Sequence, residues 1–586
     1  VSPLAAAVAR RWGIERSLFA AMLLICVGIA IRSLPSSGFL FSGTAIIGCG
    51  IALGNVLLPG LIKRDFSQHV AKLTGAYSLT MGAAAALGSA IVVPLALNGF
   101  GWRGALMVLM VFPLLALIIW FIIPVPDGVT PQAWHLLAMF VGVIAAIIGK
   151  AMPIGAIAMI AIMLVALTGV TSDKPADAVK DALSSFSSPL IWLIGVAIMI
   201  SRGILKTGLG ARIGYLFIAV WGKKTIGIGY SLALSELLLA PVTPSNTARG
   251  GGIIHPVMKA IASSYDSDPE KGTQGRIGKY LALVNYHGNP ITSAMFITAT
   301  APNPLVVDII AKATNSDIHL SWGTWALAML LPGLVAMLVM PLVIYAVYPP
   351  EIKETPNAAQ FAKERLHEMG PMNRGEKIML GIFFILLMLW AGIPAMIMGD
   401  AWKVDATTTA LIGLSLLLLT GVLTWDDILK EKSAWDTITW FAALVMMATF
   451  LNKLGLITWF SGMLESGIGH LGLGWMGASA LLLLAYMYAH YMFASTTAHI
   501  TAMLGAFYVA GISLGAPPML FALMMAAASS IMMTLTHYAT GTSPVIFGSG
   551  YTTLAEWWKA GFIMSVVNLI VFVVVGAAWW KMLGYY

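Results

Sequence analysis

Two short polar motifs that interrupt apolar sequence limit the folds open to this chain more than any other feature. The first occupies residues 245–248 and reads Ser-Asn-Thr-Ala, and the second occupies residues 495–498 and reads Ser-Thr-Thr-Ala. Similar glycine-containing turns precede them at residues 207–210 and 454–456, so the repeat extends beyond the motifs themselves. Two halves that each carry an apolar segment broken by small polar residues are typical of secondary transporters. Such breaks are tolerated at membrane depth only where the backbone faces protein, water or a ligand, so the pattern predicts a carrier for a small anion.

The composition indicates a protein that lies in the lipid bilayer along most of its length. Of the 586 residues, 59% are hydrophobic and 10% are charged, and the mean hydropathy is +0.88. Apolar runs of membrane-spanning length recur throughout, which predicts an all-α, multi-pass membrane protein. The net charge of +8 arises mainly in short loops between apolar runs, as expected of cytoplasmic loops. We therefore expect no nucleic acid among its partners.

The first 103 residues contain apolar segments but no cluster of polar residues that could form a site. Apolar segments are expected at residues 17–31, 39–61 and 73–97, and a fourth at residues 105–123. We therefore expect about four extra N-terminal membrane helices, packed through their many glycines and alanines. Because the chain begins with Val1 and not with Met, its natural start is expected further upstream.

Two stretches within this N-terminal segment carry a resemblance to a known family. Residues 3–13 and 58–66 resemble part of a major facilitator superfamily transporter of the cyanate-transporter-like group. A carrier of that family needs two six-helix halves, and about four helices cannot enclose a pathway. Residues 1–103 are therefore interpreted as a partial facilitator-like segment.

Residues 104–586 divide into two halves around a charged connector. The first repeat is expected at about residues 182–348, the connector at 349–377 and the second repeat at about 430–586, with scaffold helices between the repeats. Residues 206–224 contain four basic and no acidic side chains, whereas residues 453–470 contain one lysine and one glutamate. Because basic segments stay in the cytoplasm, this asymmetry favours inverted repeats. The connector is balanced in charge and is expected to be solvated.

Each half is predicted to contain a re-entrant hairpin and a broken helix. Around the first motif Pro241 and Pro244 end a helix, and the polar residues after them can cap a new one. Prolines interrupt a second helix in each half, at residues 298–304 and 536–544. Helix N-termini carry partial positive charge, so the four breaks could hold carboxylates; ordinary caps and simple kinks are the alternatives. The candidate substrate-binding residues on these breaks are Ser245, Asn246, Thr247, Thr300, Asn303, Ser495, Thr496, Thr497, Thr540, Thr542 and Ser543.

Longer stretches around these breaks resemble the divalent anion–sodium symporter family. The nearest branch contains the citrate–succinate, tartrate–succinate and 2-oxoglutarate–malate exchangers, and the resemblance extends from about residue 121 to residue 586. It implies an inner-membrane homodimer whose scaffold holds a mobile transport domain, which carries substrate across like an elevator. It also implies that both motifs hold the substrate carboxylates. Thr496 departs from the family, which often repeats Asn there. The stretches that carry the resemblance are residues 123–128, 132–135, 239–249, 493–499, 538–541 and 547–551.

Three ionisable residues near the motifs are candidates for charge compensation. Arg249 and His499 each lie three positions after the second residue of a motif, and Glu236 lies in the apolar run before the first motif. A buried dicarboxylate needs positive charge nearby, and we expect Arg249 and His499 to supply it in place of sodium. An arginine cannot leave with the substrate, so the empty carrier would not return, which favours obligatory exchange. The alternatives are that Arg249 pairs with Glu236 or reaches the surface, and that His499 only packs.

The sequence thus predicts a secondary transporter that exchanges di- or tricarboxylates of the citrate, succinate, malate, tartrate or 2-oxoglutarate type. A sodium-coupled dicarboxylate symporter, with sodium at the hairpin tips, and a fusion protein without transport activity are the alternatives. We expect no enzymatic activity, no cofactor and no resident metal, because no nucleophile–base or metal-ligand constellation is present. The preferred carboxylate is not specified, since hairpin donors recognise carboxylates in general.

Overall fold

The computed structural model describes residues 14–32, 39, 42–47, 49–50, 116–148, 152–315, 317–493 and 495–586. Regular structure in these residues is helical, apart from an isolated backbone bridge between Lys224 and Glu354. Helices satisfy their own backbone groups, as a bilayer requires. Five of the described helical segments are long and apolar enough to cross a membrane. They are α9 (Pro189–Thr207), α11 with the turn after it (Thr225–Val242), α15 (Trp322–Val347), α21 (Lys432–Lys453) and α28 (Leu554–Met582).

The chain forms two compact units, and the first contains most of the N-terminal region. Its described elements include α2 (Ile14–Arg32), the π-helical turn Ile118–Ile122 and most of α6 (Pro131–Ile148). The Trp134 indole donates to the carbonyls of Ile119 (3.0 Å) and Ile123 (3.3 Å), which holds the turn against α6. The apolar segment expected at residues 17–31 lies within α2. Residues 73–97, most of 39–61 and part of 105–123 lie outside the described residues, as do both stretches with the facilitator resemblance.

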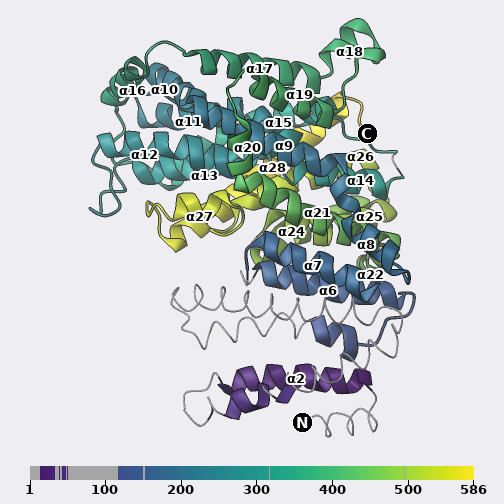
Figure 1. The fold of residues 1–586 in the computed structure, drawn as a ribbon. Helices are drawn as coiled ribbons and strands as arrows, with labels where there is room; N and C mark the ends of the chain where they lie inside the picture. Colours follow the sequence, from purple (N-terminus) through teal and green to yellow (C-terminus); the bar gives the residue numbers. More distant parts are fainter. Residues whose placement is uncertain are drawn as a thin grey trace. The chain divides into compact units, whose positions relative to one another are not determined.

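The second unit contains the same order of elements twice (Figure 1). A long helix ends at a glycine with positive φ, Gly208 (80°) or Gly455 (84°), which only glycine adopts without strain, and a shorter helix follows. A hairpin, a broken helix and a final long helix come next. The first copy consists of α9, α10 (Leu209–Trp221), α11 (Thr225–Leu239), α12 (His255–Ser264), α13 (Gly278–Met295), α14 (Asn303–Ala313) and α15. The second consists of α21, α22 (Leu456–Gly469), α23 (Trp475–Tyr488), α24 (Thr496–His499), α25 (Gly505–Ser513), α26 (Pro518–Ile531), α27 (Thr542–Phe547) and α28.

Helix α13 lies at the centre of the packing between the two copies. It contacts α15 of its own copy and α26 and α28 of the other, and α15 packs along α28 (Figure 1). Every residue of α13 except Lys279 is buried. A helix buried on all sides is normally apolar, yet α13 carries several polar side chains, which marks it as part of a polar interior.

The residues between the two copies are largely helical. Helix α16 packs against α10 (Figure 1). Arg212 of α10 donates to both oxygens of Glu376, at 2.6 and 3.1 Å, and Glu376 is 1% exposed. Glu376 is the exception in the connector at residues 349–377, since its other charged side chains, among them Lys353, Glu364 and Lys377, are exposed. The remaining helices outside the two copies are α7 (Ile154–Thr168), α8 (Pro175–Leu183), α16 (Pro356–Met369), α17 (Arg374–Trp390), α18 (Ile393–Met398), α19 (Ala406–Leu419) and α20 (Trp425–Lys430).

Candidate functional site

The two hairpins have the same local structure around their breaks. In each, the first arm ends in a 3₁₀ turn, and a serine begins the second arm three residues after that turn. The hydroxyl oxygens of Ser245 and Ser495 accept hydrogen bonds from the N–H groups of Ala248 (3.1 Å) and Ala498 (3.3 Å). Both serines therefore act as helix caps, as their residue type favours. A π-helical turn, a feature frequent at functional sites, lies in both second arms, at Thr247–Ile254 and Ile500–Leu504.

The two hairpin tips meet at the break of the second broken helix, which comprises residues 535–541 and is called the second break below. Asn246 Nδ2 donates to Thr540 Oγ1 (2.9 Å), and Thr496 Oγ1 donates to the carbonyl of Ala539 (3.2 Å). Because Ala539 and Thr540 are adjacent, Asn246 and Thr496 lie close together although they are distant in the chain. The structure thus brings together the two positions that correspond in the sequence repeat.

Helix α13 holds the two predicted residues that directly follow the second break, Thr542 and Ser543 at the start of α27. The hydroxyl groups of Ser543 and Tyr286 lie 2.7 Å apart, and Thr542 Oγ1 donates to Asn289 Oδ1 (3.4 Å). Asn289 Nδ2 also donates to the carbonyl of Asn246 (3.0 Å). Asn289 therefore joins the tip of the first hairpin to the second break.

The first break, residues 300–302, is held by hydrogen bonds that leave Asn303 little freedom. Asn303 Nδ2 donates to the carbonyls of Ser293 (2.6 Å) and Phe296 (2.9 Å), and its Oδ1 accepts from Ser530 (3.2 Å). An amide has two donor hydrogens, and both are used. Asn303 in this arrangement fastens the break to α13 and α26, which differs from the direct substrate contact expected of it. Thr300 is also buried, and its carbonyl accepts the Asn303 N–H (3.2 Å).

Arg249 is completely buried, and its charge is neutralised within the protein. Its Nε donates to Glu236 Oε1 at 2.6 Å. Nη1 donates to the carbonyls of Thr243 (2.6 Å) and Ala299 (2.7 Å), and Nη2 donates to the hydroxyls of Thr292 (3.4 Å) and Ser293 (3.1 Å). These bonds use all five donor hydrogens of the guanidinium.

This arrangement favours the alternative, an ion pair with Glu236, over direct contact between Arg249 and the substrate. The guanidinium has no donor left, and the carboxylate of Glu236 balances its charge. Its two carbonyl partners belong to the first hairpin and to the first broken helix, so Arg249 clamps these two elements together. The sequence alternative, an ion pair with Glu236, is the one that the structure shows. Glu236 itself also accepts from Asn289 Nδ2 (2.6 Å).

His499 occupies the corresponding position in the second copy and pairs with another histidine. The Nδ1 atoms of His490 and His499 lie 2.9 Å apart, and His490 Nε2 lies 3.0 Å from the carbonyl of Ala539. A carbonyl only accepts, so His490 Nε2 carries a hydrogen. When His490 is neutral, its Nδ1 accepts from His499 Nδ1–H. Both rings are fully buried, and that of Tyr486 lies 4.7 Å from His499.

The contribution of α13 was not predicted from the sequence. Asn289 and Tyr286 are its principal members, and residues 285–293 also include His287, Thr292 and Ser293. Polar residues in a membrane helix are costly and indicate function, so the signal exists. The corresponding part of α26, residues 521–529, is apolar except for its serine. A comparison of the two halves therefore does not reveal the polar residues of α13. It does not reveal His490 either, because the corresponding residue of the first half, Ala240, is apolar.

Long apolar helices, and two pairs of breaks that meet in a buried polar interior, define a membrane carrier. Residues 104–586 match the family described as "Sodium:sulfate symporter transmembrane region". The chain belongs to this family; it is a multi-pass membrane transporter and not an enzyme. Residues 1–103 lie outside the match, and their facilitator-like character stays a prediction.

Three relatives illustrate the similarity. The chain is 50% identical over 468 residues to "Putative malate transporter YflS" of Bacillus subtilis, which covers 80% of this chain and 94% of that protein. It is 44% identical over 488 residues to "Dicarboxylate transporter 1, chloroplastic" of Arabidopsis thaliana, with 82% and 84% covered. It is 37% identical over 463 residues to "Inner membrane protein YbhI" of Escherichia coli, with 78% and 94% covered.

Proposed function

We propose that this protein exchanges di- or tricarboxylates across the bacterial inner membrane. The observation that carries the proposal is the meeting of Asn246 and Thr496 at adjacent residues of the second break. Donors from both copies then surround one site, as a substrate with two carboxylates requires. The relatives described as malate and dicarboxylate transporters support this substrate class, and the relative described as an inner membrane protein supports the location.

Substrate binding in this proposal exchanges bonds within the protein for bonds to the ligand. The amide of Asn246 and the hydroxyl of Thr496 donate to neutral oxygens of the second break. A carboxylate accepts from the same donors more strongly, because charge-assisted hydrogen bonds are about twice as strong as neutral ones. Citrate, succinate, malate, tartrate and 2-oxoglutarate all present two carboxylates, and the tips do not recognise the part between them.

The proposal favours exchange over sodium coupling, because protein donors already occupy the backbone oxygens that sodium would use. Carriers of this kind coordinate sodium through carbonyls of unwound helix. Here Ala299 O accepts from Arg249, and Ala539 O accepts from His490 and Thr496. Ala299 lies four residues before the first residue of Asn303-Pro304, and Ala539 lies four residues before the first residue of Ser543-Pro544. The two carbonyls therefore occupy corresponding positions in the two copies.

Movement in this proposal follows the elevator scheme of a homodimer. The two copies are inverted repeats, and the hairpins and broken helices travel together against a scaffold of the other helices. The basic excess of residues 206–224, around α10, and its absence from residues 453–470, around α22, support the inversion, since basic segments remain in the cytoplasm.

Counterflow in proteoliposomes tests the proposed function. Uptake of labelled dicarboxylate should require unlabelled dicarboxylate inside and should not change when potassium replaces sodium. Vesicles loaded with a monocarboxylate are the control and should show only background uptake. Sodium-stimulated uptake into unloaded vesicles would identify a symporter, and an absence of uptake under every condition would identify a fusion protein without transport activity.

The contact between Thr247 and Gly541 gives a prediction about the meeting of the first tip and the second break. A Cβ atom at position 541 would lie 2.5 Å from Thr247 Oγ1. Gly541→Ala should force Thr247 into another rotamer at a cost of about 1 kcal/mol, which corresponds to an increase of about fivefold in the half-saturation concentration. Gly381→Ala is the matched control, because no atom lies within 4 Å of the added Cβ. Equal half-saturation concentrations in the two variants would contradict the prediction.

A further inference from the structure

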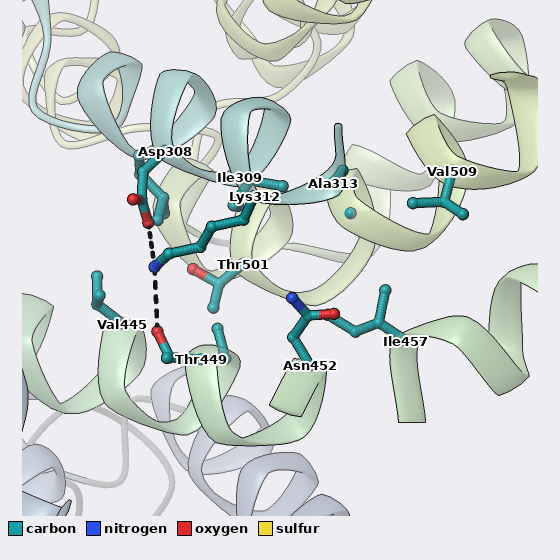
Figure 2. A pocket seen from close by; sticks show the side chains of 13 residues that line it. Asp308, Ile309, Lys312, Ala313, Val445, Thr449, Asn452, Ile457, Thr501 and Val509 are labelled. Atoms are coloured by element: carbon teal, nitrogen blue, oxygen red, sulfur yellow. Dashed lines mark hydrogen bonds and ion pairs between the residues drawn. The ribbon is translucent and has the colours of Figure 1, made fainter. Parts of the chain in front are cut away.

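A cleft lies beside the second hairpin, between α14, α21, the start of α22 and the second arm of the hairpin (Figure 2). Its volume is about 500 Å³ with the open solvent at its mouth included, and about 40 Å³ of it can hold the centre of a water molecule. Most of its lining is apolar, and its polar side chains are Asp308, Lys312, Thr449, Asn452 and Thr501. Nothing in the transport site described above uses these five residues.

The first hairpin has a partly corresponding cleft, and the lining of that cleft carries no charge. This second cleft lies between the end of α9, the start of α10 and the second arm of the first hairpin, and it contains about 480 Å³. Its lining residues include Leu205, Tyr215 and Ile253, and the lining contains no Asp, Glu, Lys, Arg or His. The charged pair beside the second hairpin lies on α14, and α27, the counterpart of α14, does not line the cleft of the first hairpin.

Lys312 holds its position in the cleft through weak interactions. Its Nζ lies 2.7 Å from Asp308 Oδ2, one helical turn earlier on α14, and 3.4 Å from Thr449 Oγ1 on α21 (Figure 2). The side chains of Lys312 and Asp308 are 41% and 32% exposed. Exposed pairs of this kind contribute about 1 kcal/mol or less, so an incoming carboxylate can replace Asp308 at little cost.

The inner end of the cleft reaches the residues of the proposed transport site. Thr501 lines the cleft and donates to the carbonyl of Thr497 (2.7 Å), which belongs to the second hairpin tip. Leu305 also lines it, two residues after Asn303 at the first break. The cleft therefore follows α14 from the tip region to the partly exposed Lys312.

We propose that this cleft is a second carboxylate-binding site, a vestibule at one mouth of the transport pathway, in which Lys312 binds the incoming dicarboxylate. One carboxylate replaces Asp308 on the ammonium group. The Thr449 hydroxyl and the Asn452 amide, on the facing helix α21, are donors for the other (Figure 2). The inference rests on the proposed function, because the ligand of the vestibule is the transported substrate.

Lys312→Met tests the vestibule through its effect on one face of the membrane. Counterflow is measured with substrate on either side, in right-side-out and inside-out vesicles, at low and high ionic strength. The half-saturation concentration should rise about threefold to fivefold on one face only, because an exposed charge pair of this strength is lost. The salt dependence on that face should fall as well. Lys312→Arg keeps the charge and should stay close to wild type.

Lys430→Met is the matched control, because Lys430 also pairs with an aspartate one helical turn earlier, Asp426 (2.5 Å), but lines neither cleft. It should leave transport unchanged on both faces. An unchanged half-saturation concentration in Lys312→Met would overturn the inference, and so would an equal rise on both faces, which indicates a structural role. An absence of counterflow in the wild-type protein would instead overturn the proposed function, and this inference with it.

A labelling experiment separates the vestibule from the transport site and does not require transport. Thr449→Cys is introduced after Cys26 and Cys49, the two cysteines of the chain, are changed to serine, and it is labelled with a membrane-impermeant maleimide. Succinate should slow the labelling, and Lys312→Met should remove this protection. Protection should persist when Asn246→Ala weakens the transport site. Loss of protection in Asn246→Ala, or its survival in Lys312→Met, would overturn the inference.

Discussion

Arg249→Ala is expected to abolish transport and to destabilise the protein strongly. Removal of one partner of a buried ion pair costs about 3–5 kcal/mol, because the other charge stays buried without compensation. Here the uncompensated group is the carboxylate of Glu236, which is 1% exposed. The carbonyls of Thr243 and Ala299 would also lose their donors. Thermal unfolding in detergent and counterflow in proteoliposomes measure the two effects.

Three further variants distinguish the clamp from a mere positive charge. Arg249→Lys should not rescue transport, because an ammonium group cannot reproduce the planar guanidinium that reaches both Thr243 and Ala299. Arg249→Met combined with Glu236→Gln should regain much of the lost stability but no transport. Arg276→Ala, which removes an exposed pair with Asp266 (3.8 Å), is the control and should resemble wild type. Wild-type stability in Arg249→Ala would show that Glu236 does not need its partner.

Asn246→Ala and Thr496→Ala are expected to weaken substrate binding without large effects on folding. Each removes a side-chain donor to a carboxylate, and a charge-assisted hydrogen bond contributes about 1.5–3 kcal/mol, or roughly tenfold to hundredfold in affinity. The loss should be smaller for Thr496→Ala, since a hydroxyl has one donor hydrogen and an amide has two. Half-saturation in counterflow and stabilisation by added succinate against heat report the change.

The control for these substitutions is Thr420→Ala, because the Thr420 hydroxyl donates only within its own helix end, to the carbonyls of Leu416 (2.7 Å) and Leu417 (3.3 Å). Thr496→Asn restores the residue that the family often has there and should bind substrate at least as well as wild type. Unchanged half-saturation in both alanine variants would mean that Asn246 and Thr496 only shape the turns.

The sequence predicted the helices and the position of their breaks because these features are local. Prolines end helices and small polar residues cap them within a few positions, so the hairpin tips at Ser245 and Ser495 follow from short segments. The repeat then linked the two tips without any structural information. The extra N-terminal helices, the homodimer and the elevator movement stay predictions.

The partners of the charged residues could not be predicted, because they depend on packing between distant segments. The sequence left open whether Arg249 faces the substrate or Glu236, and the decision depends on the carbonyl of Ala299, which a different element contributes. His490 and His499 lie nine residues apart in the sequence, a spacing that does not predict contact, yet the hairpin brings their Nδ1 atoms within 2.9 Å of each other. Local patterns show where polar groups lie and not which groups they meet.

The clamp made by Arg249 has a consequence for which part of the carrier can act as a gate. Three of the guanidinium's hydrogen bonds, to the carbonyl of Ala299 and the hydroxyls of Thr292 and Ser293, join the first hairpin to the first broken helix. Opening this hairpin alone would leave these charged donors without acceptors, so we expect it to stay with the broken helix. The second hairpin is fastened to Ala539 by His490 and Thr496 through uncharged groups when His490 is neutral. The two mouths of the pathway are therefore unequal, and local opening to admit or release a substrate is cheaper at the second hairpin.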